Sequence, residues 1–167
     1  FNEKLYIGKR EEVFVYNEST GNFDLYYHLA GKDITLSCLH LDEKKNLWMG
    51  TTSNGLYCLS DDKKISQPVT RGNIASIYED SSKELWIGSW EEGLYHVKKD
   101  GSIENLHHEP GNPNSLCSNF VRSCSEDNAG NLWIGTFHGL NRYEKSTGKF
   151  QLYTANANKP DGLTHSS

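Results

Sequence analysis

The sequence predicts an all-β protein built from repeated four-stranded antiparallel sheets, and three observations lead to this prediction. A Leu-aromatic-apolar-Gly motif occurs four times, with its aromatic residue at positions 6, 48, 86 and 133. An aspartate precedes three of these aromatic residues by six positions, and a Gly-Leu pair follows three of the motifs. No segment has helical length and period, so repeats of 42, 38 and 47 residues are expected to be units of β-strands.

One repeat shows how each unit is expected to fold. Alternating apolar and polar residues predict four strands, and acidic or glycine-containing turns separate them. In the third copy these strands are expected at 74–78, 84–88, 93–97 and 103–107. Four antiparallel strands in a period of roughly 40–45 residues are typical of a β-propeller blade.

The repeats predict a β-propeller fragment of about four blades, which is an incomplete ring. The expected segments are an incomplete blade at 1–29, blades at 30–69, 70–109 and 110–154, and a linker into the next blade at 155–167. The first copy starts at a second strand, so we expect a chain excised from a larger ring. An open array exposes apolar blade faces at its ends. The remaining blades are the partners expected to cover these faces, and self-association is a further expectation.

The repeated residues are interpreted as the framework of each blade. The motif Trp is expected to pack between neighbouring sheets, with a hydrogen-bond partner for its indole N–H. The Gly after it would allow close approach or positive φ where the strand ends. The Asp before it is expected to hold the turn between the first and second strands. A ligand site is therefore expected in the loops that do not repeat.

Composition excludes several classes of function. The net charge is −5 and no block of Lys or Arg stands out, which argues against nucleic-acid binding. No apolar stretch approaches the roughly 20 residues that cross a bilayer, so this segment is expected not to contact the membrane. The four cysteines form no CxxC pair and are expected to be free, mostly buried thiols.

The fourth copy carries a family resemblance. Its residues Glu126-Asp127-Asn128-Ala129-Gly130-Asn131-Leu132-Trp133-Ile134-Gly135-Thr136, followed by Gly139-Leu140-Asn141-Arg142-Tyr143, resemble the two-component regulator propeller repeat. The resemblance implies the extracytoplasmic, periplasmic sensor region of a hybrid two-component histidine kinase, with further sensor domains downstream. It also implies signal transduction in response to an oligosaccharide. The full-length protein would then be a histidine kinase, whereas this segment is expected not to be an enzyme.

The candidate ligand-binding residues lie in loops that antiparallel alternation places on one face of the blades. Trp90 is the leading candidate, because it lies outside the repeat motif and an indole can stack on a sugar face, although it could instead plug a local packing gap. Glu91 and Glu92 follow it and could accept hydrogen bonds from sugar hydroxyls. The corresponding loop of the fourth copy carries Phe137 and His138, and an earlier loop carries Arg10, which could pair with an acidic sugar or be a solvated charge.

Catalytic and metal sites are weakly supported by the sequence. Glu91 and Glu92 are adjacent, which is a poor match to the two carboxylates that flank a glycosidic bond. His107, His108 and Glu109 are neighbours along a chain whose side chains alternate between faces, so they would not easily converge on a metal. No catalytic residue, metal ligand or cofactor is therefore predicted.

The leading functional hypothesis is a non-catalytic sensor segment that binds a carbohydrate or another small ligand. The first alternative is a scaffold for protein–protein interaction, in which the same loops or an exposed blade edge dock another protein. The second alternative is a propeller lyase or hydrolase, which would need Glu91 or Glu92 for turnover.

Overall fold

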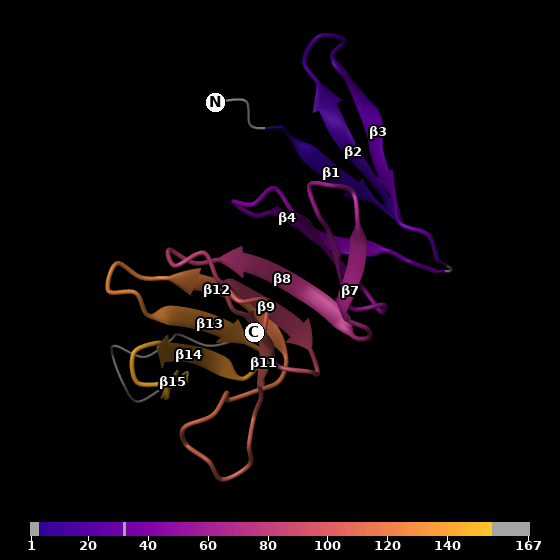
Figure 1. Cartoon of the computed structure of the whole chain (residues 1–167). Helices are drawn as coiled ribbons and strands as arrows, with labels where there is room; N and C mark the ends of the chain where they lie inside the picture. The colour runs from indigo at the N-terminus through magenta and orange to yellow at the C-terminus, as the bar shows by residue number, and fades with distance from the viewer. Residues whose placement is uncertain (1–3, 32, 155–167) are drawn as a thin grey trace. The chain divides into compact units, whose positions relative to one another are not determined.

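The computed structural model describes residues 4–31 and 33–154, and these residues form fifteen β-strands and no helix. The described residues accordingly include no helix of the length and apolarity that a membrane span requires. The linker predicted at 155–167 lies outside the described residues. The chain divides into two compact units, unit 1 at Phe1–Ile74 and unit 2 at Ala75–Ser167. Each unit is drawn as strands and connecting loops in Figure 1.

The strands form four antiparallel sheets, which we call blades 1 to 4. Blade 1 contains β1 (Tyr6–Lys9), β2 (Glu12–Asn17) and β3 (Asn22–His28). Blade 2 contains β4 (Leu36–Leu41), β5 (Leu47–Thr51), β6 (Leu56–Leu59) and β7 (Ile65–Val69). Blade 3 contains β8 (Asn73–Glu79), β9 (Leu85–Trp90), β10 (Leu94–Val97) and β11 (Ile103–Leu106). Blade 4 contains β12 (Val121–Glu126), β13 (Leu132–Thr136), β14 (Gly139–Glu144) and β15 (Lys149–Tyr153).

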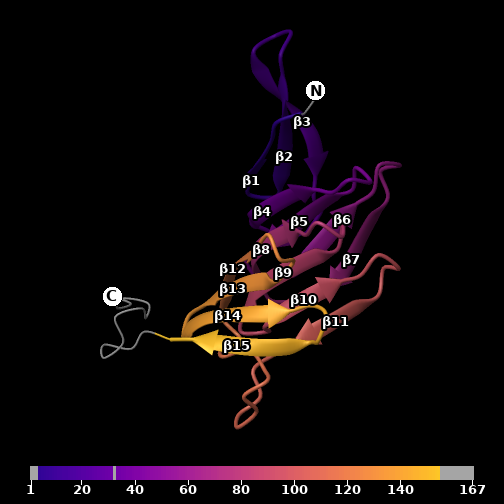
Figure 2. The ribbon, with the colours of Figure 1, turned by 90° about the vertical axis from the view of Figure 1, so that its left-hand side faces the viewer.

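Within each blade the strands pair in chain order, and Figure 2 shows β12 to β15 as one such series. Short turns are enough to connect the strands, because each antiparallel strand begins at the end of the sheet where the preceding strand finishes. The all-β propeller fold predicted from the repeats is confirmed.

Each unit has its own apolar core. In unit 1 the buried cluster consists of Val13, Leu29, Ile34, Leu47, Met49 and Leu59. In unit 2 it consists of Trp86, Leu94, Leu116, Val121, Leu132 and Ile134. Both clusters combine residues from two blades, so burial of these side chains holds neighbouring blades face to face.

The motif glycines allow side chains of the neighbouring strand to pack closely against the backbone. A Cβ on Gly50 would lie 2.5 Å from Cys38 Sγ, and one on Gly88 would lie 2.7 Å from Ser76 Oγ. The backbone at these two glycines has no positive φ. Of the two expected reasons for this glycine, only close packing therefore applies. Positive φ occurs instead at the glycine of the Gly-Leu pair, for example 82° at Gly93.

One face of blade 1 is apolar and exposed. The register places Ile7 beside Phe14 and Leu25, and the rings of Tyr16 and Phe23 lie 5.2 Å apart on the same face. All of these side chains except Phe14 are exposed. A surface of this kind is typical of a sheet that packs against another element.

Candidate functional site

In unit 2 the loops expected to share a face do meet. Trp90 ends β9, Phe120 immediately precedes β12, and Phe137 follows β13. The N–H of Gly93 donates to the carbonyl of Asn119 at 3.0 Å, and the N–H of Phe137 donates to the carbonyl of Phe120 at 3.0 Å. These two hydrogen bonds attach the linker between blades 3 and 4 to the loop of each blade.

Three aromatic side chains gather on this face. The ring centroids of Trp90 and Phe120 lie 6.4 Å apart, and those of Phe120 and Phe137 lie 6.2 Å apart. The exposed fraction is 42% for Trp90, 36% for Phe120 and 62% for Phe137. Neighbouring exposed rings are unusual on a soluble surface and mark binding sites. Trp90 is thus partly exposed on this face, and its ring also packs against that of Phe120.

Arg122 completes this surface, which we call the aromatic patch (Trp90, Phe120, Arg122 and Phe137). Its guanidinium carbon lies 5.5 Å from the Trp90 ring centroid and 5.9 Å from that of Phe137. A β-bulge between Val121 and Ser123 leaves Arg122 outside the regular ladder with β13. Bulges re-aim side chains, and here the residue at the bulge lies over the two rings. The patch therefore combines apolar ring faces with a cluster of N–H donors.

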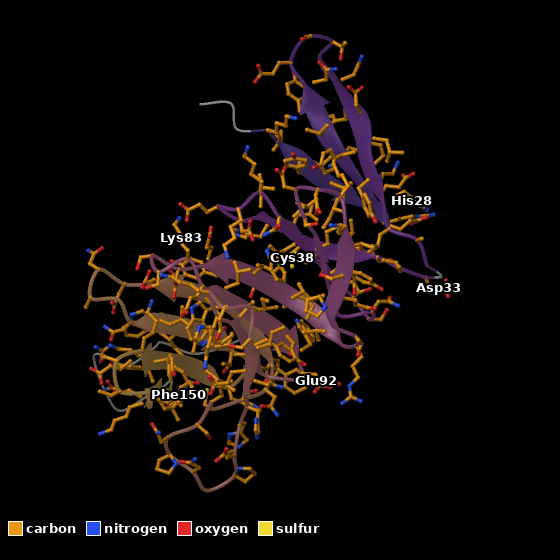
Figure 3. All side chains as sticks on the ribbon, in the orientation of Figure 1. His28, Asp33, Cys38, Lys83, Glu92 and Phe150 are labelled. Carbon is orange, nitrogen blue, oxygen red and sulfur yellow. The ribbon has the colours of Figure 1, made fainter. Side chains whose placement is uncertain are left out.

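The loop after Trp90 is held in a strained conformation. Glu91 has a φ of 83°, in the left-handed region that non-glycine residues rarely adopt. Ser89 Oγ accepts the N–H of Glu92 at 3.1 Å and donates to the carbonyl of Gly93 at 3.0 Å. Glu92, labelled in Figure 3, lies in this loop. Glu91 and Glu92 therefore directly follow Trp90 of the patch in the sequence.

His138 borders the patch and Arg10 does not belong to its unit. The His138 ring centroid lies 5.3 Å from that of Phe137, with the planes 76° apart. Arg10 lies in unit 1, in the turn between β1 and β2, with a φ of 53°. Together with Glu11 and Asp33 it lines a cavity of about 310 Å³. The aromatic patch consists of residues from unit 2 and does not include Arg10.

Phe120 and Arg122 were not predicted from the sequence. A signal for them exists in the repeat itself, because they flank the apolar residue that starts the first strand. The other first strands have Thr35 and Ser37, or Asn73 and Ala75, at these positions. The available signal was therefore two bulky side chains at positions that carry Thr, Ser, Asn or Ala in the other copies.

Unit 2 also contains an ionic cluster, formed by Asp80 just after β8, Glu126 at the end of β12 and Lys145 just after β14. Lys145 Nζ lies 2.9 Å from Asp80 Oδ2 and also contacts Glu126 Oε1. Glu126 in turn accepts the backbone N–H of Ser81 at 2.7 Å, which connects blade 4 to blade 3. Burial opposes ionisation of Asp80, but hydrogen bonds from Trp86, Glu84 N–H and Lys145 outweigh it and lower the pKa of Asp80. This cluster is structural, because its carboxylates are already paired.

Within residues 4–31 and 33–154, no group of three His, Cys, Asp or Glu side chains is arranged to hold a metal ion. All four cysteines are free. Cys38 is labelled in Figure 3 and contacts the Ile74 carbonyl at 4.0 Å through its sulfur.

The comparisons with known proteins bear on this fold and its repeats. The family model described as "two component regulator propeller" matches residues 69–91 and 115–138. Two segments of the chain therefore match the two-component regulator propeller repeat. These segments contain Trp90, Phe120, Arg122 and Phe137, so the aromatic patch lies within the matched residues. No curated protein matches the chain at a significant level.

The chain also resembles solved structures. The extracellular domain of BT3049 from B. thetaiotaomicron, described as a hybrid two-component system, is 28% identical with a TM-score of 0.71, and the match covers 93% of this chain and 21% of that one. The extracellular domain of BT4673 from the same organism, described in the same way, is 24% identical with a TM-score of 0.69, over 83% of this chain and 20% of that one. An auxiliary nutrient binding protein of B. thetaiotaomicron has the same fold, at 14% identity and a TM-score of 0.63, over 92% of this chain and 39% of that one. The chain thus spans about a fifth of the two extracellular domains that it matches.

Proposed function

We propose that this chain is a non-catalytic sensor segment of a hybrid two-component system, and that its aromatic patch binds a carbohydrate. The observation that carries the proposal is the exposed cluster of Trp90, Phe120 and Phe137 around the Arg122 guanidinium. The 28% identity to an extracellular domain of a hybrid two-component system supports the sensor context. The same likeness supports a periplasmic location.

The chemistry of the patch suits a sugar. The C–H face of a pyranose stacks on aromatic rings, and its hydroxyl groups hydrogen-bond to charged donors and acceptors. Trp90 and Phe137 supply ring faces, and Arg122 supplies N–H donors between them. Glu91, which directly follows Trp90 and is exposed, supplies an acceptor. Signalling would follow if the occupied and empty receptor differ in the arrangement that they favour.

The test is a screen of the folded chain against neutral and acidic oligosaccharides, followed by calorimetric titration of the compounds that bind. We expect saturable binding, and we expect Trp90→Ala to weaken it at least tenfold. Leu152→Ala is the matched control, because Leu152 is an exposed apolar residue on β15, outside the patch. Absence of binding to every oligosaccharide by a folded protein would overturn the carbohydrate proposal.

The two alternatives have distinct outcomes. A purified protein partner whose binding is lost in Trp90→Ala, with no sugar bound, would assign the patch to a protein interface. Turnover of a glycan that is lost in Glu91→Gln would revive the hydrolase or lyase hypothesis. Glu91 and Glu92 are adjacent in the chain, which is a poor match to the two carboxylates that flank a glycosidic bond.

A further inference from the structure

We propose that the saccharide bound by the aromatic patch is acidic, and that its anionic group, a carboxylate or a sulfate, pairs with the Arg122 guanidinium. This specificity rests on the proposed function, because it requires that a sugar binds the patch, and it adds the chemical class of that sugar. Arg122 is exposed and lies over the rings of Trp90 and Phe137.

The Arg122 guanidinium has no carboxylate partner in the described part of the chain. The ion pairs of lysines in the same unit show the contrast: Lys98 pairs with Glu104 at 3.0 Å, and Lys145 pairs with Asp80 at 2.9 Å. The contacts of Arg122 are with the faces of two rings. Such contacts leave N–H donors available, because a guanidinium carries five of them in its own plane. Both the charge and the donors can therefore serve a ligand.

The two glutamates that follow Trp90 leave this charge in place. Among the described residues, neither Glu91 nor Glu92 forms an ion pair with Arg122. Carboxylates accept hydrogen bonds from neutral hydroxyl groups but repel an anion, whereas a guanidinium attracts it. We therefore expect the acidic group of the sugar to lie at Arg122 and its hydroxyl groups to lie toward the glutamates.

The backbone on both sides of Arg122 is held by contacts within unit 2. Val121 is fully buried, and Ser123 pairs with Gly135 beyond the bulge. The carbonyl of Phe120 accepts the N–H of Phe137 at 3.0 Å. A side chain on a fixed backbone and between two rings loses less freedom when it binds a ligand. Its planar fork can then form two parallel hydrogen bonds with a carboxylate or a sulfate.

The cation is specific to this junction between blades. The residues equivalent to Arg122 in the first strands of blades 2 and 3 are Ser37 and Ala75. The residue equivalent to Phe137 in blade 2 is Thr52. A framework residue would recur with the Trp-Gly motif, and an ordinary solvated arginine would not need aromatic neighbours. The combination of a cation with neighbouring rings therefore indicates recognition of a ring-shaped anion.

The probes are oligosaccharides in pairs that differ in charge. Trigalacturonate and a glucuronate disaccharide are each compared with the methyl ester, and a sulfated galactotriose is compared with galactotriose. Calorimetric titration of the folded chain measures the affinities. We expect the tightest ligand to be acidic and to bind more tightly than its neutral counterpart by a factor of about five or more. Added NaCl should reduce this factor, because salt screens an exposed ion pair. The carboxylate and sulfate pairs show which anionic group is bound.

The variant Arg122→Gln tests the guanidinium. It should lower the affinity for the acidic sugar and barely change that for its neutral counterpart, so the ratio of the two falls to about one. Lys149→Gln is the matched control, because it removes the same charge from an exposed residue of unit 2. Lys149 pairs with Glu144, at the end of β14 opposite the turn that contains Phe137. This control should keep the ratio, and the melting temperature checks that both variants fold.

The outcomes separate this specificity from the proposed function. Suppose a neutral oligosaccharide binds as tightly as every acidic one, and Trp90→Ala abolishes that binding. The acidic specificity then fails, while the carbohydrate site remains. An acid preference that Arg122→Gln leaves unchanged also refutes the assignment, because another cation must then supply the preference. If the folded protein binds no oligosaccharide, both proposals fail.

Discussion

The indole Nε1 of Trp86 donates a hydrogen bond of 2.9 Å to Oδ2 of Asp80, six residues earlier in the chain. The same bond joins Trp48 to Asp42 at 2.8 Å and Trp133 to Asp127 at 2.9 Å. The aspartate therefore holds its turn and also satisfies the one polar atom of the buried indole. This explains why the two residues recur together at a fixed spacing.

Replacement of Asp80 by Ala is expected to lower the free energy of unfolding by about 3 kcal/mol. The change leaves the buried Trp86 N–H and the Lys145 ammonium without their shared acceptor. Urea unfolding followed by circular dichroism measures the effect. Asp42→Ala is the control, because the bonds recorded for the Asp42 carboxylate in the described part of the chain go to Trp48 and Asn46. An equal loss in both variants would show that the lysine contact adds nothing.

Stability is expected to fall in acid. The pKa of Asp80 and that of Glu126 are both lowered in the folded protein, because hydrogen bonds and Lys145 outweigh the effect of burial. Groups with a depressed folded pKa stabilise the protein above their unfolded pKa of about 4, and this stability is lost as the pH falls further. The free energy of unfolding should therefore be flat from about pH 7 to 5 and decrease below about pH 4.

Lys145 sets how much stability this acid transition removes. Lys145→Met removes the cation that favours ionised Asp80 and Glu126, so the folded pKa of both carboxyls rises toward its unfolded value and the stability lost below about pH 4 should be smaller than in the unchanged protein. The pKa of Lys145 itself is raised by its two carboxylate partners, against the effect of burial. Its contribution is therefore present below about pH 10 and is lost only at higher pH. An identical acid profile in both proteins would contradict this account.

Arg122→Lys is expected to weaken the binding of any oligosaccharide that the aromatic patch takes by about threefold to tenfold, roughly 0.7–1.4 kcal/mol. Lysine keeps the charge but lacks the planar guanidinium that lies over Trp90 and Phe137. The measurement is calorimetric titration, with the melting temperature as the check on folding. Unchanged affinity would show that charge alone matters at this position.

Cys124 and Cys58 are expected to resist alkylation in the native state. Burial raises the pKa of Cys124 to about 12, and burial together with the charge of Asp42 raises the pKa of Cys58 to about 11. The reactive thiolate is therefore scarce at pH 8. Iodoacetamide labelling followed by mass spectrometry should modify both residues only after unfolding in urea. Rapid labelling of Cys124 in the folded protein would contradict its burial.

Much of the fold was predictable because each blade repeats a local pattern. Strand alternation, acidic turns and the recurrent Trp-Gly pair are properties of neighbouring residues, and they predicted sheets such as β8 to β11 within one or two residues. For the motif Gly the sequence offered two reasons, close packing and positive φ, and only close packing is confirmed at Gly50 and Gly88. Whether a glycine is needed for positive φ or for close packing depends on what lies against it, here Ser76 and Val121 for Gly88.

The candidate site was predictable only in part. Trp90 and Phe137 could be selected because they interrupt the repeat in loops on one face. Phe120 and Arg122 were missed, because their position over those loops depends on a linker hydrogen bond and on a bulge in β12. The use in ligand binding of all six predicted residues stays a prediction: Trp90, Glu91, Glu92, Phe137, His138 and Arg10.

The sequence by itself determined the blade, its four-strand order and its Trp-Gly framework, since these follow from period and alternation along a short stretch of chain. Only the tertiary structure decided which residues form a surface. Trp90 and Phe137 are 47 positions apart in the sequence, and packing of β12 against β9 places Arg122 beside both rings. Contacts between strands of different blades create that proximity, and no local pattern of residues specifies it.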